Sequence, residues 1–298
     1  NLKAQHPQLE IVISGDERVE WVFRHLPAMA RFVLKGSNEE QDALALADAV
    51  VDYHDIIGRM ADFYNGIGYM DVLANLAGVS LERRGLHYHV EPEEGAWAEG
   101  RLVALGEPAL VVGLQLHTNK DVKRSYPHGQ ALVERLSERY PHARFILFGQ
   151  ESLDAPHPAV LDCAREGIAF RRQMALAYRC EAFLTIDSAF FHIGHNLCKK
   201  PTLTLFGVTN PLLSGNPETG FGLLQNREMA CLSCYWQTPC QIECMTQLAP
   251  ETVVDAFERL LENPAAVRVP RGLEPLRTTL PPTPEIEAAL LEQLWHRP

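Results

Sequence analysis

The sequence predicts an α/β fold with two parallel sheets, and two observations carry that prediction. Apolar runs alternate with amphipathic helical patterns along the chain, as is typical of right-handed βαβ crossovers in parallel sheets. The length of 298 residues favours two domains, at roughly 150 residues per domain. We therefore expect two α/β sheets with a cleft between them, and ligands at the carboxyl ends of the strands.

The elements expected in the first half of the chain are short. Strands are predicted at residues 9–14, 32–34 and 49–53, and helices at residues 17–29 and 39–50. The run LEIVIS at residues 9–14 opens this series, and each later strand is separated from its neighbour by a helical pattern. The first half therefore has the alternation of a small parallel sheet.

The pattern is clearer in the second half. The run ALVVGLQL at residues 109–116 has the continuous apolar character of a strand buried on both faces. A helix is expected at residues 130–140, because Leu132, Val133, Leu136 and Tyr140 fall on one face. The other expected elements are strands at 144–148, 183–186 and 202–206 and a helix at 251–261.

Two segments divide the chain. Residues 91–106 are charged and contain glycine, so they are expected to be the linker between the domains. Residues 269–284 are rich in proline and should be extended and semi-rigid, with a short terminal helix after them at 285–295. The expected parts are an N-terminal domain at 1–100, a C-terminal domain at 101–268 and a tail at 269–298.

Composition excludes several classes of protein. Lys and Arg number 27 against 38 Asp and Glu, a formal charge of −11, so a broad nucleic-acid-binding face is not expected. No apolar run approaches the ~20 residues that span a bilayer, and the polar start does not resemble a signal peptide. Motifs of dinucleotide-binding dehydrogenases, P-loop enzymes, α/β-hydrolases and zinc proteases are absent from the sequence. We expect a cytoplasmic protein with at most peripheral contact with an inner membrane.

The first candidate site follows a predicted strand. The segment DSAFFH at residues 187–192 ends that strand at Asp187, and Ser188 is placed to cap a helix. Free N–H groups at such a helix start favour a phosphate, and His192 would lie one turn further on. The alternative is that Asp187 and Ser188 only cap the helix and His192 is a partly buried surface residue.

Two further loops come after predicted strands. The first holds Lys120, Lys123 and Arg124, and an Arg guanidinium suits a diphosphate while Lys supplies a point charge. An ordinary solvated loop is the alternative for these three residues. The second loop holds Glu151, which could accept hydrogen bonds from a ribose diol or a base amine.

Four cysteines lie within fourteen residues. Cys231, Cys234, Cys240 and Cys244 have the spacing of a closed tetrahedral site for zinc or iron. Two disulfides, or a role for the first pair alone, are the alternatives, although a reducing cytosol disfavours disulfides. A four-thiolate site leaves no open position for catalysis, so the metal is expected to be structural and transfer chemistry is not expected to need one.

Three ordered motifs together resemble one family. The segment at 187–192 is similar to D-S/T-G-x-x-H, residues 201–211 (PTLTLFGVTNP) to P-x-x-x-L-F-G-x-T-x-P, and residues 244–253 (CMTQLAPETV) to C-M-x-x-I-x-P-E-x-V. These are motifs of the ADP-heptose:lipopolysaccharide heptosyltransferases, glycosyltransferase family 9. The resemblance covers most of the chain and is densest at residues 109–261. It implies a GT-B fold, in which two Rossmann-like domains hold a nucleotide sugar in their cleft.

The resemblance also implies roles for individual residues. Residues 124–127 (RSYP) match the basic loop of the family, so Arg124, next to Lys123, would contact the phosphates. Glu151 would hold the ribose or base. The diphosphate and sugar pocket would be completed by Asp187, Ser188, His192 and Thr209.

The sequence departs from the family pattern in two ways. Ala189 stands where the family usually has glycine. The family also begins with a strand and a glycine-rich loop whose acidic residue activates the acceptor, whereas residues 1–7 here resemble the end of the first helix and the first domain would lack its first strand. Asp16 and Asp55, which follow strand candidates, are the substitutes for the catalytic base.

The resulting prediction is an inverting glycosyltransferase that acts in lipopolysaccharide biosynthesis. Its donor would be a nucleotide-diphospho sugar, ADP-heptose or a relative, and its acceptor a hydroxyl of a glycan, a lipid-linked sugar or a protein. The alternative is a catalytically inactive binding or assembly protein that keeps the nucleotide pocket and the structural metal. A third alternative is a redox protein with a cysteine-ligated iron.

Overall fold

The structure is a computed structural model, and it divides the chain into two compact units, 1–89 and 90–298. The described residues are 2–17, 20, 23, 31–52, 74, 77–81, 86–106, 108–118, 122–214, 221–229, 231–234 and 241–263. No helix among these residues is long and apolar enough to cross a bilayer.

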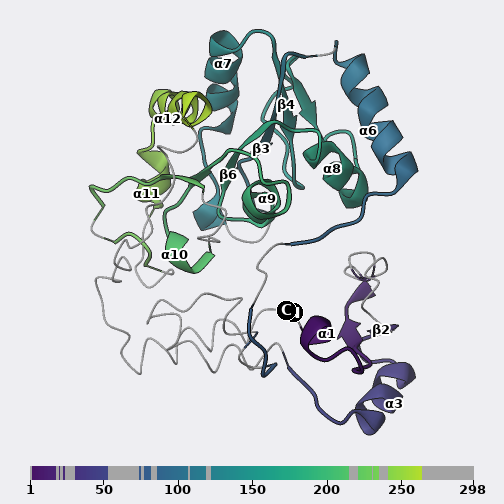
Figure 1. Cartoon of the computed structure of the whole chain (residues 1–298). Helices are drawn as coiled ribbons and strands as arrows, with labels where there is room; N and C mark the ends of the chain where they lie inside the picture. The colour runs from purple at the N-terminus through teal and green to yellow at the C-terminus, as the bar shows by residue number, and fades with distance from the viewer. Residues whose placement is uncertain are drawn as a thin grey trace. The chain divides into compact units, whose positions relative to one another are not determined.

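The described part of the first unit has a two-stranded parallel sheet. Its elements are α1 (Leu2–Gln5), β1 (Val12–Gly15), β2 (Arg31–Leu34) and α3 (Asn38–Leu46) (Figure 1). Ser37 caps α3 by accepting a hydrogen bond from the Glu40 N–H at 3.1 Å. The Glu40 carboxylate accepts from Gly36 N and from the Ser14 hydroxyl, which fastens the start of α3 to the ends of both strands.

The second unit contains a six-stranded parallel sheet. The strands are β3 (Leu110–Gln115), β4 (Ala143–Leu147), β5 (Val160–Asp162), β6 (Ala182–Ile186), β7 (Thr202–Leu205) and β8 (Gly222–Leu224). Their spatial order is β5-β4-β3-β6-β7-β8. The chain moves outward from β3 through β4 to β5 and then returns to the other side of β3, so the strand order reverses between β3 and β6. This reversal is where open α/β sheets form ligand sites.

Helices cover both faces of this sheet. Figure 1 shows α7 (Gly129–Arg139) and α12 (Pro250–Glu262) together over one face, with α6 (Pro92–Ala104) and α8 (Phe170–Ala177) over the other. The strands are buried on both sides, and most of their residues are apolar, as expected for a parallel sheet between two helical layers. The shorter helical segments are η2 (Val122–Arg124), α9 (Ala189–His192), the π-helix η3 (Ile193–Leu197), α10 (Pro211–Ser214) and α11 (Glu243–Thr246).

Two glycines make room for one aromatic ring in the core. A Cβ on Gly113 would lie 2.5 Å from the Phe183 ring, and a Cβ on Gly194 would lie 2.8 Å from it. Phe183 is fully buried on the central strand β6. The ring thus fixes how closely η3 approaches β3 and β6, and it holds the segment after β6 against the sheet.

Most of the elements expected in the second half are confirmed, with bounds shifted by one or two residues. In the first half, β1, β2 and α3 overlap the predicted segments and each extends one residue beyond them, whereas residues 49–52 form no strand. Most of the helix expected at 17–29, together with the tail and terminal helix expected after residue 263, lies outside the described residues.

The prediction that residues 91–106 form a linker is wrong. This segment is the helix α6, which begins with a capping box between Glu91 and Glu94 and with Pro92 in its first turn. Its charged side chains form ion pairs with the rest of the second unit, including Arg171 to Glu94 at 2.5 Å. The unit boundary lies between His89 and Val90, before this helix. The charged residues that suggested a linker form the exposed and ion-paired side of a packed helix. The helix α8 and the strands β5 and β8 are further elements that the sequence pattern did not predict.

Candidate functional site

A pocket of about 600 Å³ opens at the carboxyl end of the six-stranded sheet. The loops after β3, β4, β5 and β6 all contribute to its lining, so it lies at the reversal of strand order. Its polar side chains come from Gln115, His117, Thr118, Arg124, Gln150, Gln173 and Ser188. Ile168, Ala169 and Phe170 give part of its wall an apolar character.

The loop after β3 places Arg124 in this pocket. Tyr126 N donates to Leu116 O at 2.8 Å, and Thr118 N donates to Ser125 Oγ at 3.0 Å. These bonds hold η2 next to the carboxyl end of β3, the strand that precedes it. Arg124 then donates from a guanidinium nitrogen to the Asp187 carbonyl at 2.9 Å, which joins the basic loop to the segment after β6. Lys123 precedes it in η2 and is partly buried.

Tyr126, the aromatic residue of the basic loop, anchors this loop in the core. Its side chain is fully buried, and its hydroxyl donates to the Leu248 carbonyl at 2.7 Å. Burial raises the pKa of Tyr126 well above its ordinary value, so the hydroxyl stays protonated and keeps donating. His128 Nε2 also lies 2.6 Å from the Thr246 carbonyl. Two motifs more than a hundred residues apart in the sequence therefore contact each other directly.

The segment after β6 departs from the predicted capping. Ser188 occupies the N-cap position of α9, but its side chain makes no capping hydrogen bond. Instead Phe190 N donates to the side-chain oxygen of Gln115 at 2.9 Å. Asp187 is buried, and its carboxylate accepts from Ser214 Oγ at 3.5 Å. The N–H of Phe190, expected to face a phosphate, is thus satisfied within the chain.

Gln115 is a pocket residue that sequence analysis missed. It is 6% exposed and ends a strand that is otherwise apolar. The one signal available was an amide side chain at the carboxyl end of a buried strand, where a polar residue needs a hydrogen-bond partner.

His192 and His195 follow on α9 and η3. Burial lowers the pKa of His192, with Asp187 raising it and Arg124 lowering it further, so these three groups act on one another. Burial also lowers the pKa of His195 to about 4, where it stacks on Phe191 at 4.2 Å between ring centroids. At neutral pH both imidazoles are uncharged, and Arg124 supplies positive charge at this end of the pocket.

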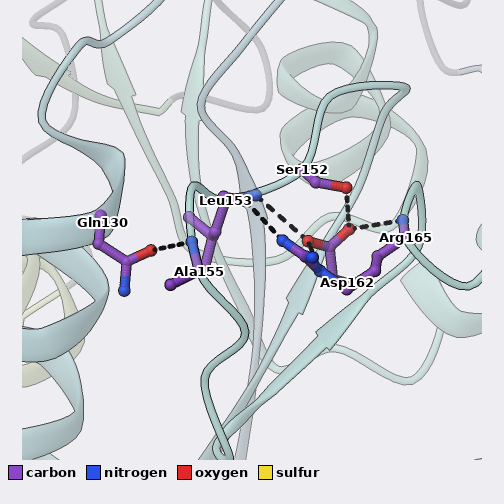
Figure 2. Close-up of polar contacts among 6 residues, drawn as sticks. All are labelled: Gln130, Ser152, Leu153, Ala155, Asp162 and Arg165. Carbon is purple, nitrogen blue, oxygen red and sulfur yellow. Dashed lines mark hydrogen bonds and ion pairs between the residues drawn. The ribbon is translucent and has the colours of Figure 1, made fainter.

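Two loops on the other side of the pocket are held by a buried carboxylate (Figure 2). Asp162 accepts from Ser152 Oγ and Leu153 N, each at 3.2 Å, and from Arg165 N at 3.0 Å. Gln130 on α7 adds a bond from Ala155 N at 3.2 Å. The loops after β4 and β5 are therefore tied together where they line the pocket.

Glu151 belongs to the loop after β4 but is exposed, and its neighbours Gly149 and Gln150 line the pocket. Glu151 acts on His117, a lining residue, by raising its pKa, although burial has the larger effect and lowers it. Gly149 is pinned by Gln173, whose side-chain oxygen accepts from Gly149 N at 3.1 Å. Glu151 therefore lies close to the pocket, at its rim.

Thr209 and Asp16 are not among the residues that line the pocket. Thr209 follows β7 and is buried, and no partner for its hydroxyl is present among the described residues. Asp16 is exposed just after β1 in the first unit. Asp55 and Lys120 lie outside the described residues.

The cysteine segment lies against the loop after β7. Ser233, between Cys231 and Cys234, donates from its N–H to Gly207 O at 2.9 Å, and a Cβ on Gly207 would lie 2.6 Å from Cys244 Sγ. Both ends of the segment therefore meet the same loop. Cys240 lies outside the described residues, and among those described no three His, Cys, Asp or Glu side chains are grouped as metal ligands.

Comparison with known proteins finds a family similar to one segment of this site. The sequence model of glycosyltransferase family 9 (heptosyltransferase) matches residues 168–253, from the pocket wall before α8 into α12. This stretch is similar to the heptosyltransferases of glycosyltransferase family 9. No curated protein sequence matches the chain.

Solved structures share the fold. A glycosyltransferase family 9 protein from Veillonella parvula matches with a TM-score of 0.62 and 14% identity, over 87% of this chain and 90% of that one. ADP-heptose lipopolysaccharide heptosyltransferase II from Escherichia coli matches with a TM-score of 0.54 and 12% identity, over 88% and 92%. TibC from enterotoxigenic E. coli, a dodecameric iron-containing heptosyltransferase solved with ADP-D-β-D-heptose, matches with a TM-score of 0.59 and 10% identity, over 88% and 70%.

These matches confirm the predicted GT-B fold and the resemblance to glycosyltransferase family 9. They support the predicted glycosyltransferase. The matched family segment contains Asp187, Ser188, His192 and Thr209, whereas Arg124 and Glu151 precede it. The structure brings Arg124 to Asp187 across 63 residues of sequence.

Proposed function

We propose that the protein transfers a sugar from a nucleotide-diphospho donor to a hydroxyl acceptor with inversion at the anomeric carbon. The donor would be ADP-linked heptose or a closely related sugar. The family segment at 168–253 supports this proposal, as does the ADP-D-β-D-heptose complex of TibC, whose fold is similar.

One observation carries the proposal. Arg124 reaches the segment after β6 through its bond to the Asp187 carbonyl at 2.9 Å, inside a pocket of about 600 Å³. A guanidinium at the carboxyl ends of parallel strands, where the strand order reverses, suits the diphosphate of a nucleotide. The pocket volume is in the range of small-molecule sites, roughly 300–1,000 Å³.

The expected chemistry is a displacement at the anomeric carbon. The acceptor oxygen forms a bond to that carbon from the face opposite the diphosphate, and the carbon–oxygen bond to the diphosphate breaks with both electrons leaving on ADP. Arg124 would stabilise the negative charge that develops on the leaving group. The acceptor proton would pass to a carboxylate, with Asp16 and Asp55 as the candidates from sequence.

Acceptor and location belong to the same proposal. A sugar hydroxyl of a lipopolysaccharide precursor is the acceptor that best fits the E. coli heptosyltransferase II, which shares the fold. Other glycans, lipid-linked sugars and protein hydroxyls remain alternative acceptors. We propose action in the cytoplasm, with peripheral contact at the inner membrane where the acceptor is lipid-linked.

We also propose that Cys231, Cys234, Cys240 and Cys244 hold one structural zinc or iron ion. Contact of both ends of the segment with the loop at Gly207 supports this, and TibC, of similar fold, is iron-containing. Metal analysis of purified protein should find about one ion per chain, lost in a Cys231→Ser, Cys234→Ser double variant. A metal-free, folded wild-type protein would contradict the proposal.

The function is tested by release of ADP from ADP-heptose in the presence of candidate acceptors. Arg124→Ala should lower the rate by about 10²-fold, the effect expected for loss of one charged contact to a developing anion. Arg139→Ala is the matched control, because Arg139 pairs with Glu258 on the surface of α7 and α12. Tight ADP binding without turnover on any acceptor would instead favour the inactive binding protein.

A further inference from the structure

The pocket contains two buried glutamines, and they differ in how their amide groups are used. Gln173 uses both ends: its oxygen accepts from Gly149 N at 3.1 Å, and its nitrogen donates to Ile168 O at 2.8 Å. Gln115 uses its oxygen, which accepts from Phe190 N at 2.9 Å. Within the part of the chain that the structure describes, no acceptor takes the Gln115 Nε2 hydrogens.

The bond to Phe190 fixes which way the Gln115 amide faces. Only the side-chain oxygen can accept from a backbone N–H, so the NH₂ group must lie on the other branch of the amide. A Cβ on Gly149 would lie 3.7 Å from this Nε2, and both Gln115 and Gly149 line the pocket. Two N–H donors are therefore held at the pocket wall by a side chain that is 6% exposed.

The position of these donors in the pocket follows from two hydrogen bonds. Arg124 bonds to the carbonyl of Asp187, and Gln115 bonds to the N–H of Phe190, three residues further along the same segment. The amide thus lies at the end of the pocket that carries the guanidinium. Ile168, Ala169 and Phe170, on the loop that leads into α8, give the pocket an apolar wall.

We propose that Gln115 is a specificity-determining residue of the donor site, whose Nε2 donates a hydrogen bond to a diphosphate oxygen while its oxygen holds the start of α9. This inference rests on the proposed function, because it assigns the ligand at this end of the pocket as the diphosphate. Because Gln115 lines the pocket, its NH₂ group can donate to a ligand there, and the positive charge of Arg124 at the same end favours an anionic oxygen as the acceptor.

Gln115→Glu is the sharpest test because it is isosteric. The glutamate can still accept from Phe190 N, so the segment after β6 stays in place and the melting temperature should match wild type. Its second oxygen replaces the NH₂ donor with negative charge. ADP affinity, measured by calorimetric titration at pH 8, should fall at least tenfold, AMP affinity should fall less, and adenosine affinity should change less than twofold.

Two further measurements separate binding from structure. The affinity gap for ADP between Gln115→Glu and wild type should narrow as the pH falls from 8 to 5.5, because protonation of the new carboxyl removes the repulsion. Gln130→Glu is the charge-matched control: Gln130 lies on α7, outside the pocket lining, and its oxygen accepts from Ala155 N. It should bind ADP as wild type does.

The outcomes separate this inference from the function beneath it. Wild-type protein that binds neither ADP, UDP nor GDP would overturn the proposed function and this inference together. Wild-type affinity for ADP in folded Gln115→Glu would overturn only the role of Gln115. Equal losses for ADP and adenosine would also overturn it, because Nε2 would then face the nucleoside. Should Gln115→Glu fail to fold, Gln115→Met replaces it and should lose ADP affinity severalfold while keeping that for adenosine.

Discussion

The described residues of the two units differ strongly in how far their apolar side chains are buried. In the second unit, both faces of a six-stranded sheet are packed against helices, and the strands are almost entirely buried. In the first unit, α3 buries none of its residues. Of the nine large hydrophobic side chains exposed among the described residues, seven lie in the first unit: Leu9, Leu34, Leu44, Leu46, Val50, Val51 and Leu86.

This difference in burial explains why the second unit has a well-defined candidate site. In the second unit, a dense core fixes the loops after four strands, and hydrogen bonds such as Tyr126 to Leu248 lock the motifs to one another. The pocket is built from those loops. In the described part of the first unit, Asp16 is an exposed residue after a short strand, so the donor side of the proposed reaction is better defined than the acceptor side.

The contrast in burial predicts the largest effect on stability. Phe183→Ala should lower the free energy of unfolding by about 3–5 kcal/mol, because it empties a close-packed space between Gly113 and Gly194. Leu44→Ala, on the exposed face of α3, should change it by less than about 0.5 kcal/mol. Chemical denaturation followed by circular dichroism measures both, and equal losses would contradict the contrast.

A second prediction concerns the pH dependence of stability. Burial lowers the pKa of His195 to about 4, so this imidazole is uncharged near neutral pH. The hydrogen bond to the Phe191 carbonyl partly offsets the effect of burial, and repulsion from His192 lowers the pKa further. The unfolded chain binds a proton at this residue near pH 6.5 and the folded chain does not, so stability should fall as the pH drops from 6.5 towards 4. The expected loss from this one group is about 3 kcal/mol.

The control for that loss is His195→Phe, which keeps an aromatic ring beside Phe191 and removes the titration. Its unfolding free energy should decline less steeply than that of wild type over the same pH range. Parallel pH profiles would mean that other groups, and not His195, cause the decline.

The third and smallest predicted loss of stability tests whether α6 is a packed helix of the second unit or a free linker. Arg171 and Glu94 form a largely buried pair with contacts at 2.5 and 2.7 Å, and Glu94→Gln should cost about 1–3 kcal/mol by leaving the guanidinium partly unpaired. Glu99, on the same helix, makes an exposed pair with Arg179 at 3.5 Å, so Glu99→Gln should cost less than about 0.5 kcal/mol. Thermal unfolding of the two variants gives the comparison, and a helix that acted as a free linker would show no difference.

Sequence patterning predicted the central strands well because parallel strands buried on both faces are continuous apolar runs, as at 109–116 and 202–206. It failed for β5 and β8, which are three residues each, too short for a pattern. It also failed for α6, whose charged residues suggested solvent although they form ion pairs with the rest of the second unit.

The candidate site was predicted in part for similar reasons. Motif residues such as Arg124 and Asp187 stood out by type and spacing, and their contact follows from the sheet topology. Gln115 did not, because its role depends on a hydrogen bond to Phe190, 75 residues away in sequence. Long-range partners of that kind depend on three-dimensional packing that no local pattern encodes.

The central claim is that the second unit carries a nucleotide-diphosphate site organised by Arg124. Calorimetric titration of the full chain with ADP, UDP and GDP, without added metal, tests it most directly. We expect micromolar ADP binding in preference to UDP and GDP, reduced about 10²-fold in Arg124→Ala and unchanged in Arg139→Ala. Absence of binding to all three nucleotides, or ADP binding that survives Arg124→Ala, would contradict it.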